Sequence, residues 1–294
     1  MAGTRGASHP FVRISKAYES ILGRWAPTLS FTVTKAMARQ LQSPPYSIRS
    51  PIFTLHDRPA AVFKPIIKSP ERLLFLSRLE ETKPYTEQIM ACKMRILVSS
   101  TSWTPDEDFR LLLDALVSYS TAKSTLPSLP PILAIITGKG PQKQYYLDRI
   151  AELESTKQLT GITIKTAWLS TSDYALLLGS ADLGVCLHKS SSGVDLPMKV
   201  VDMFGAGLPV VGYSNYESWP ELVTEGVNGR GFVTSEELKT ILVELFDNDP
   251  KTKTKAWKPS AALEILRFGA LEEGRRRWDD EWDGVAGRVL GLCD

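Results

Sequence analysis

Cysteine and histidine are scarce in this chain of 294 residues, which contains three of each. The cysteines, Cys92, Cys186 and Cys293, lie far apart and form no CxxC pair, which argues against a disulfide framework and against a zinc site. This usage fits a reducing compartment best. With so few histidines, histidine-based metal chemistry is not expected either.

Long apolar runs and strong net charge are also missing. No run of about 18 apolar residues occurs, so the sequence predicts no membrane-spanning helix. Residues 1–10 are small and polar and do not form a secretory signal peptide. The net charge of +2 is too small to indicate nucleic acid as a partner. A hydrophobic fraction of 43% is enough for a normal buried core.

Strands and helices alternate from Met94 onward. Strands are expected at 94–99, 132–136, 162–166, 182–187 and 208–213, and helices at 106–119, 142–153, 173–178, 198–204 and 236–246. This alternation is typical of an α/β fold in which helices cover both faces of a parallel sheet. Such a sheet binds ligands at the carboxyl ends of its strands.

The remaining segments predict two smaller parts, residues 1–65 and residues 261–294, on either side of a sheet domain at 66–260. Expected in the first part are helices at 15–25 and 35–41, a strand at 29–34 and an extended, proline-rich linker at 43–65. One or two strands are too few for an independent sheet domain. In the helical tail, Trp278 and Trp282 share one face. We expect them to pack toward residues 1–65, or on the sheet domain alone, since large aromatics should not stay in water.

An acidic run follows the first predicted strand. Thr104 suits a helix N-cap, Pro105 suits the first helical position, and Glu107 completes a capping box. Residues 106–108 also look like a metal-binding DxD motif. Because the capping box accounts for the same residues, we expect no metal site.

A short glycine loop, Gly138, Lys139 and Gly140, follows the second strand. Glycines let the backbone approach a phosphate or a sugar, and the N-terminus of the next helix favours anions. The loop has neither the GxxxxGK[ST] nor the GxGxxG form. A ligand-binding loop and a plain tight turn both remain open.

The loop after the fourth strand combines hydroxyls, a glycine, an acid and a lysine in front of a helix. Its candidate ligand-binding residues are His188, Ser190, Ser191, Ser192, Gly193, Asp195, Pro197, Met198 and Lys199. Hydroxyls and free N–H groups at such a place bind diphosphate oxygens. The alternative is a flexible loop with Asp195 as a helix cap. We favour ligand binding, because this fold places ligands at strand ends.

Asp202 lies on the following helix, seven residues after Asp195. At about 100° per residue the two acids face the same side within about 20°. Lys199 lies nearly on that side as well. Asp202 therefore faces the ligand or pairs with Lys199 on a solvated surface.

Two long motifs resemble one known family. They are LVSSTSWTPDEDF at residues 97–109 and SADLGVCLHKSSSGVDLPMKVVDMFG at residues 180–205. With shorter runs at 33–37, 57–59 and 221–229, they resemble the chitobiosyldiphosphodolichol beta-mannosyltransferases over most of residues 8–235.

The resemblance implies a GT-B fold, in which two Rossmann-like domains face each other across a cleft. It implies inverting transfer of mannose from GDP-mannose to dolichol-diphosphate-linked chitobiose, a step in lipid-linked oligosaccharide synthesis for N-glycosylation. The implied location is the cytosolic face of the endoplasmic reticulum membrane. Other glycosyltransferases of the pathway are further expected partners. GDP-mannose is the donor substrate, and no separate cofactor is expected.

The sequence departs from the family pattern in two places. Many GT-B enzymes carry an E-x7-E acidic pair, whereas Asp195 and Asp202 have six residues between them. Asp202 matches the second acid, which usually meets the donor ribose. Residues 99–109 lack the Arg and Lys that usually follow the first donor-domain strand. Lys139 or Lys199 is therefore expected to supply positive charge to the diphosphate.

The resemblance also assigns the parts of the chain. Residues 66–260 would be a complete C-terminal donor domain and residues 1–65 the remnant of an N-terminal acceptor domain. The family's membrane anchor, first glycine-rich loop, acceptor surface and catalytic base are expected ahead of the matched residues, so we name no catalytic residue. Two alternatives stay open. One is an inactive nucleotide-sugar-binding fragment or assembly partner. The other is a GT-B transferase with another donor or a retaining outcome, against which residues 196–205 argue.

Overall fold

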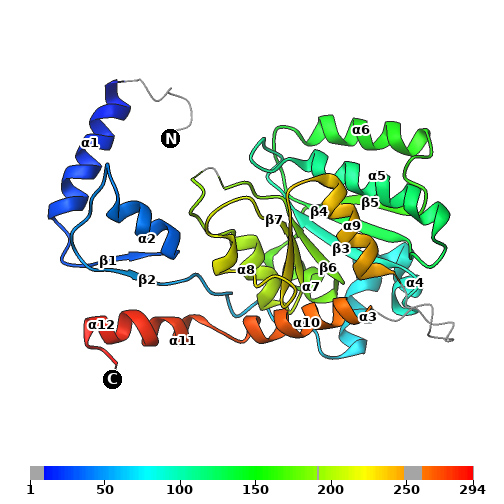
Figure 1. The fold of residues 1–294 in the computed structure, drawn as a ribbon. Helices are drawn as coiled ribbons and strands as arrows, with labels where there is room; N and C mark the ends of the chain where they lie inside the picture. Colours follow the sequence, from blue (N-terminus) through cyan, green and yellow to red (C-terminus); the bar gives the residue numbers. More distant parts are fainter. Residues whose placement is uncertain (1–9, 191, 248–259, 294) are drawn as a thin grey trace.

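The computed structural model describes residues 10–190, 192–247 and 260–293. Its main body is a six-stranded, fully parallel sheet with the strand order β5-β4-β3-β6-β7-β8 (Figure 1). The strands are β3 (Arg95–Ser100), β4 (Ile132–Thr137), β5 (Ile162–Ala167), β6 (Leu183–Cys186), β7 (Val210–Tyr213) and β8 (Gly229–Phe232). The predicted α/β fold with a parallel sheet is confirmed.

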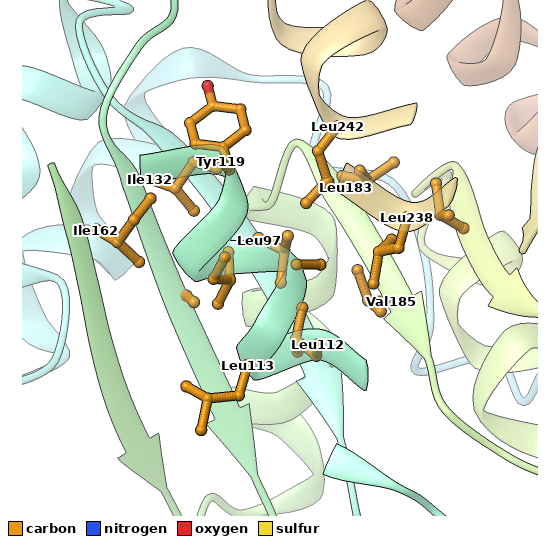
Figure 2. Packing of buried hydrophobic residues seen from close by; sticks show 14 of the residues in the cluster. Leu97, Leu112, Leu113, Tyr119, Ile132, Ile162, Leu183, Val185, Leu238 and Leu242 are labelled. Carbon is orange, nitrogen blue, oxygen red and sulfur yellow. The ribbon is translucent and has the colours of Figure 1, made fainter. Parts of the chain in front are cut away.

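Helices cover both faces of this sheet because the strand side chains alternate between two hydrophobic cores. Leu97 of β3 points into one core, and its neighbours Ile96 and Val98 point into the other. The first core lies under α5 (Phe109–Thr125), α6 (Lys143–Ser155) and α9 (Ser235–Phe246). Figure 2 shows part of it, with Leu112 of α5 and Leu238 of α9 packed over the strands.

The second core is covered by a different set of helices. These are α3 (Ser69–Arg78), α4 (Thr86–Met90), α7 (Thr171–Ser180) and α8 (Met198–Gly205). Helix α10 (Ala261–Gly274) contributes to both cores, through Leu263 and Leu266 on one side and Ala270 on the other. The first helix of the tail therefore packs on the sheet domain.

The strand order creates a switch point at β3. From β3 the chain moves to β4 on one side, and it later returns to β6 on the other side. The loops that follow β3 and β6 therefore diverge from neighbouring strand ends. In doubly wound sheets this divergence leaves the crevice in which ligands bind.

The N-terminal part consists of α1 (Pro10–Trp25), β1 (Ser30–Thr32), α2 (Lys35–Gln42) and β2 (Ile52–Thr54). Strands β1 and β2 pair in parallel as a separate two-stranded sheet. The prediction of an unbroken linker over 43–65 is therefore wrong at 52–54. The prolines flank this strand without interrupting it, and the Pro51 carbonyl accepts a hydrogen bond from Ser30 at 2.9 Å.

Two buried or half-buried carboxylates tie this N-terminal part to the rest of the chain. Glu221, in the short helix η2 (Trp219–Glu221), accepts hydrogen bonds from the backbone N–H groups of Lys35 and Ala36 at 2.6 and 2.8 Å. His56 Nε2 lies 3.1 Å from Glu221, and His56 Nδ1 lies 3.4 Å from Glu281. We call Glu221, Glu281, His56 and Arg58 the carboxylate clasp.

Glu281 brings the C-terminal tail into the clasp. It lies on α11 (Trp278–Trp282), and Arg58 binds it at 2.8 Å. Burial alone would raise the pKa of Glu281, but Arg58 and the His56 N–H outweigh burial and hold this pKa below its ordinary value. The chain then continues through the π-helical turn Asp283–Gly287 and α12 (Arg288–Leu290). The tail thus contacts residues near position 56 as well as the sheet domain.

Some predicted boundaries moved and some elements were missed. Helices α3 and α4 and strand β8 were not predicted, and α5 begins at Phe109 and not at residue 106. No helix in the described parts of the chain is both long enough and apolar enough to cross a bilayer.

Candidate functional site

A cavity of about 440 Å³ opens at the carboxyl ends of β3, β4 and β5 and reaches the first turn of α8. Its walls include Ser100, Gly138, Lys139, Trp168, Tyr174 and Lys199. This is the edge of the sheet at which the fold class places ligands. Of the predicted site residues, Gly138, Lys139 and Lys199 line the cavity directly.

The glycine loop is shaped by close contact with the loop after β3. Gly138 has φ +125°, and a Cβ there would lie 1.9 Å from the Thr101 carbonyl oxygen. At Gly140 a Cβ would lie 1.6 Å from the Ser102 carbonyl oxygen. Only glycine fits both positions, since any side chain would collide with backbone. The two loops therefore form one wall of the cavity.

Lys199 forms an ion pair with the buried carboxylate of Glu107. Burial alone would raise the pKa of Glu107. The Lys199 ammonium and hydrogen bonds from the Ser102 backbone and hydroxyl outweigh burial and hold this pKa below its usual range. Asp202 does not pair with Lys199, so that alternative is wrong. The site therefore presents a lysine whose counter-charge comes from the loop after β3.

The predicted capping box at Thr104 and Glu107 is wrong. Residues 104–107 form a turn, in which the Glu107 N–H donates to the Thr104 carbonyl at 3.0 Å. Helix α5 begins later, and its N-cap is Asp108, which accepts from the Arg110 N–H at 3.2 Å. Glu107 is turned inward toward Lys199, since a buried carboxylate requires a cation or donors.

The loops after β3 and β6 are joined to each other. Glu107 and His188 form an isolated antiparallel bridge, and the Lys189 N–H donates to the Asp106 carbonyl at 2.8 Å. The Lys189 ammonium also lies 3.2 Å from Asp108. These contacts close the switch point between β3 and β6 and hold the serine-rich loop beside the cavity.

Asp195 organises that loop. Its carboxylate binds His188 Nε2 at 2.8 Å, the Ser190 hydroxyl, and the Ser192 hydroxyl at 3.2 Å. Burial alone would raise the pKa of Asp195, but Ser190 and His188 outweigh it and lower this pKa. The alternative of Asp195 as a helix cap is wrong, because Pro197 occupies the cap position and no side chain caps α8.

The remaining residues of this loop lie around the same turn. Gly193 has φ +77°, and its carbonyl accepts from the Glu217 N–H at 3.0 Å. Pro197 and the half-exposed Met198 lead into α8. Ser191 lies outside the described residues. Asp195 precedes the first helical residue of α8, so the helical-wheel argument that aligned it with Asp202 does not hold.

Asp202 is partly buried on α8, and none of the other described residues forms a hydrogen bond or ion pair with its carboxylate. Burial raises its pKa to about 6. It lies close enough to Tyr174 for its charge to raise the pKa of that phenol, to which burial contributes most. Tyr174 in turn shares a hydrogen bond of 2.8 Å with Ser100. Asp202 is thus a carboxylate without a partner beside a cavity-lining residue.

Two features of the site escaped the sequence prediction. Trp168 follows β5 directly, is 65% exposed and lines the cavity. A tryptophan just after a predicted strand was a usable signal, since ligands gather at strand ends. The role of Glu107 could not be found, because its partner Lys199 is 92 residues away in sequence. Within the described ranges, no group of three or more His, Cys, Asp or Glu side chains is placed to hold a metal ion.

Comparison with known proteins gives two curated relatives along nearly the whole chain. The chain is 53% identical over 289 residues to "Chitobiosyldiphosphodolichol beta-mannosyltransferase" of Arthroderma benhamiae, which covers 98% of this chain and 62% of the relative. It is 43% identical to the protein of the same name from Candida albicans, covering 94% of this chain and 55% of that protein. The chain therefore spans about six-tenths of the length of these relatives.

Solved structures confirm the architecture. One, described as "Crystal structure of Anabaena Alr3699/HepE in complex with UDP", aligns with a TM-score of 0.65 at 17% sequence identity. The alignment covers 94% of this chain and 66% of that chain. At this identity the likeness establishes the fold, which is that of the GT-B glycosyltransferases.

The family model described as "Glycosyl transferases group 1" matches residues 93–248. That stretch begins just before β3 and runs past α9, so it contains the sheet, the glycine loop, the Glu107–Lys199 pair and Asp202. The cavity and the loops that close it lie inside the matched region. The chain belongs to the group 1 family of glycosyltransferases.

Proposed function

We propose that this chain contains the donor domain of a beta-mannosyltransferase, and that the cavity binds GDP-mannose. The acceptor would be dolichol-diphosphate-linked chitobiose, in lipid-linked oligosaccharide synthesis for N-glycosylation. Like the acceptor, the cytosolic face of the endoplasmic reticulum membrane and association with other glycosyltransferases of the pathway belong to the proposal. The observation that carries the donor site is a cavity with two lysines at the ends of parallel strands.

The cavity can stabilise a departing diphosphate. Lys199 stands at the uncapped N-terminus of α8, where the helix dipole also favours an anion. As the bond to the sugar breaks, negative charge develops on the diphosphate, and fixed positive groups lower the barrier by stabilising it. When the diphosphate binds, the Lys199 ammonium can turn from Glu107 to the phosphate oxygens.

Asp202 would bind the ribose of the donor. Its carboxylate is half-buried and lacks a partner among the described residues, so a hydroxyl donor would satisfy it. Inversion also requires a general base on the acceptor hydroxyl. None of the residues of this cavity is assigned that role.

The donor proposal is tested by calorimetry with GDP-mannose, GDP and UDP. We expect GDP-mannose and GDP to bind, and UDP to bind more weakly. Lys199→Ala should weaken GDP by about 1.5–3 kcal/mol, the value of a charge-assisted hydrogen bond. Lys239→Ala, on the solvent side of α9, is the matched control and should bind as the unmodified chain does. UDP that binds as tightly as GDP would overturn the choice of donor.

The acceptor proposal is tested in a chimera. Residues 1–294 would replace the matching stretch of the Arthroderma benhamiae relative, to which they are 53% identical. We expect the chimera to transfer labelled mannose from GDP-mannose to a short-chain lipid-diphosphate chitobiose, with a β linkage seen by NMR. A folded chimera that binds GDP but forms no product, or forms an α linkage, would refute the assignment.

A further inference from the structure

Trp168 is an exposed aromatic side chain held in place at the rim of the cavity. It occupies the short connection between β5, which ends at Ala167, and α7, which begins at Thr171. Ser170 caps α7 by accepting from the Asp173 N–H at 3.1 Å, so both ends of the connection are fixed. Although the indole is pinned in this way, it is 65% exposed and lines the cavity. A large aromatic so exposed and so constrained is available for stacking.

Lys139 approaches the same ring from the neighbouring strand. The parallel register pairs Thr137 with Ala167, so the residues that follow these two stand side by side. The Lys139 ammonium lies 4.1 Å from the centre of the Trp168 ring, within the range of a cation–π contact. Together they form a flat aromatic surface with one mobile cation at its edge.

This surface lies at a distance from Lys199 that suits a nucleotide. In the sheet, β4 and β3 lie between β5 and β6. At about 4.8 Å per strand, the end of β5 is roughly 14 Å from the end of β6. Lys199 pairs with Glu107, which is bridged to His188 just after β6. An extended nucleoside diphosphate bridges such a span with its base at one end and its phosphates at the other.

We propose that Trp168 is the stacking platform for the base of the donor nucleotide and that Lys139 reads the edge of that base. The base takes the place of the ammonium over the indole, and the ammonium then donates to acceptor atoms. Guanine offers two such acceptors, N7 and O6, on one edge. The larger purine also covers more of the indole than a pyrimidine does. This inference rests on the proposed function, and it adds the residues that select guanine.

The test compares Trp168→Ala, Trp168→Phe and Lys139→Met, with Trp278→Ala as a matched control in the tail. Binding of GDP, UDP and inorganic pyrophosphate is measured by calorimetry, and indole fluorescence is recorded in parallel. Trp168→Ala should weaken GDP about tenfold or more and leave pyrophosphate unchanged, since stacking contributes roughly 1–3 kcal/mol per base. Trp168→Phe should retain most of the GDP affinity but lose the fluorescence quenching. Lys139→Met should narrow the preference for GDP over UDP.

The outcomes separate this inference from the function on which it rests. Equal binding of GDP and UDP by the unmodified chain would refute the donor assignment. If Trp168→Ala then weakened both nucleotides and spared pyrophosphate, the stacking role would stand. Trp168→Ala that left GDP unchanged, or that weakened pyrophosphate as much as GDP, would overturn the stacking role. Lys139→Met that left the ratio of GDP to UDP affinity unchanged would remove Lys139 from base recognition.

Discussion

Replacing Asp202 with asparagine should stabilise the free chain at neutral pH. The pKa of Asp202 is raised from 3.8 to about 6 by burial, and none of the other described residues offsets this burial with a hydrogen bond or charge. A rise of about 2 pKa units corresponds to about 3 kcal/mol of penalty on the ionised form. Because the carboxyl is partly solvated, we expect about 1–2 kcal/mol.

The pH dependence fixes the sign of this effect. Below pH 3.8 Asp202 is protonated in both the folded and the unfolded chain, so it carries no penalty. Between about 4 and 6 the unfolded chain loses this proton first, and the folded state becomes less stable as pH rises. Above pH 6 the penalty is constant. Asp202→Asn should therefore match the unmodified chain near pH 4.5 and exceed its stability at pH 8.

Urea denaturation at the two pH values measures the difference directly. The quantity to compare is the free energy of unfolding of Asp202→Asn minus that of the unmodified chain. A difference that is the same at pH 4.5 and pH 8 would refute the burial argument. The same variant should bind GDP more weakly if Asp202 accepts from the ribose. Stability gained together with affinity lost is the pattern expected of a residue kept for binding.

Three further predictions follow from the packing around the site. Gly140→Ala should destabilise the chain by more than about 2 kcal/mol, because its Cβ would lie 1.6 Å from the Ser102 carbonyl oxygen; thermal unfolding measures this, with Gly284→Ala, which meets no atom within 4 Å, as the neutral control. Arg277→Ala should cost about 1.5–3 kcal/mol in chemical denaturation, since its guanidinium donates to the Phe63 carbonyl at 3.1 Å and to the Gly205 carbonyl at 3.4 Å; an unchanged midpoint would contradict it. GDP affinity measured by calorimetry should be the same with and without a chelator, and affinity that collapsed in chelator and returned with manganese would disprove this.

The sheet domain could be predicted because its signals are local. Each strand from β3 to β7 is an apolar run a few residues long, and the helices between them repeat apolar residues at helical spacing. Strand β8 was missed because two of its four residues are glycines, which carry no strand signal. Strand β2 was missed because prolines surround it, although none lies inside it.

The site was less predictable because its key contacts join distant residues. The glycine loop and the serine-rich loop could be found from strand ends, and the structure places both beside the cavity or in its wall. The partner of Glu107 could not be found in this way, because a capping motif and a buried ion pair place the same residue types at the same positions. The motif fits an exposed helix start, and only the fold shows that Glu107 is 5% exposed.

The carboxylate clasp has a consequence for the order in which the chain is assembled during synthesis. His56 leaves the ribosome 225 residues before Glu281, its partner on α11. Residues 35–58 can pair β1 with β2 by themselves, but they cannot be held in place until Glu221 and then Glu281 have been made. Contacts of such long range form late, because the intervening loop must close first. The earliest part of the clasp to be translated is thus the last to dock.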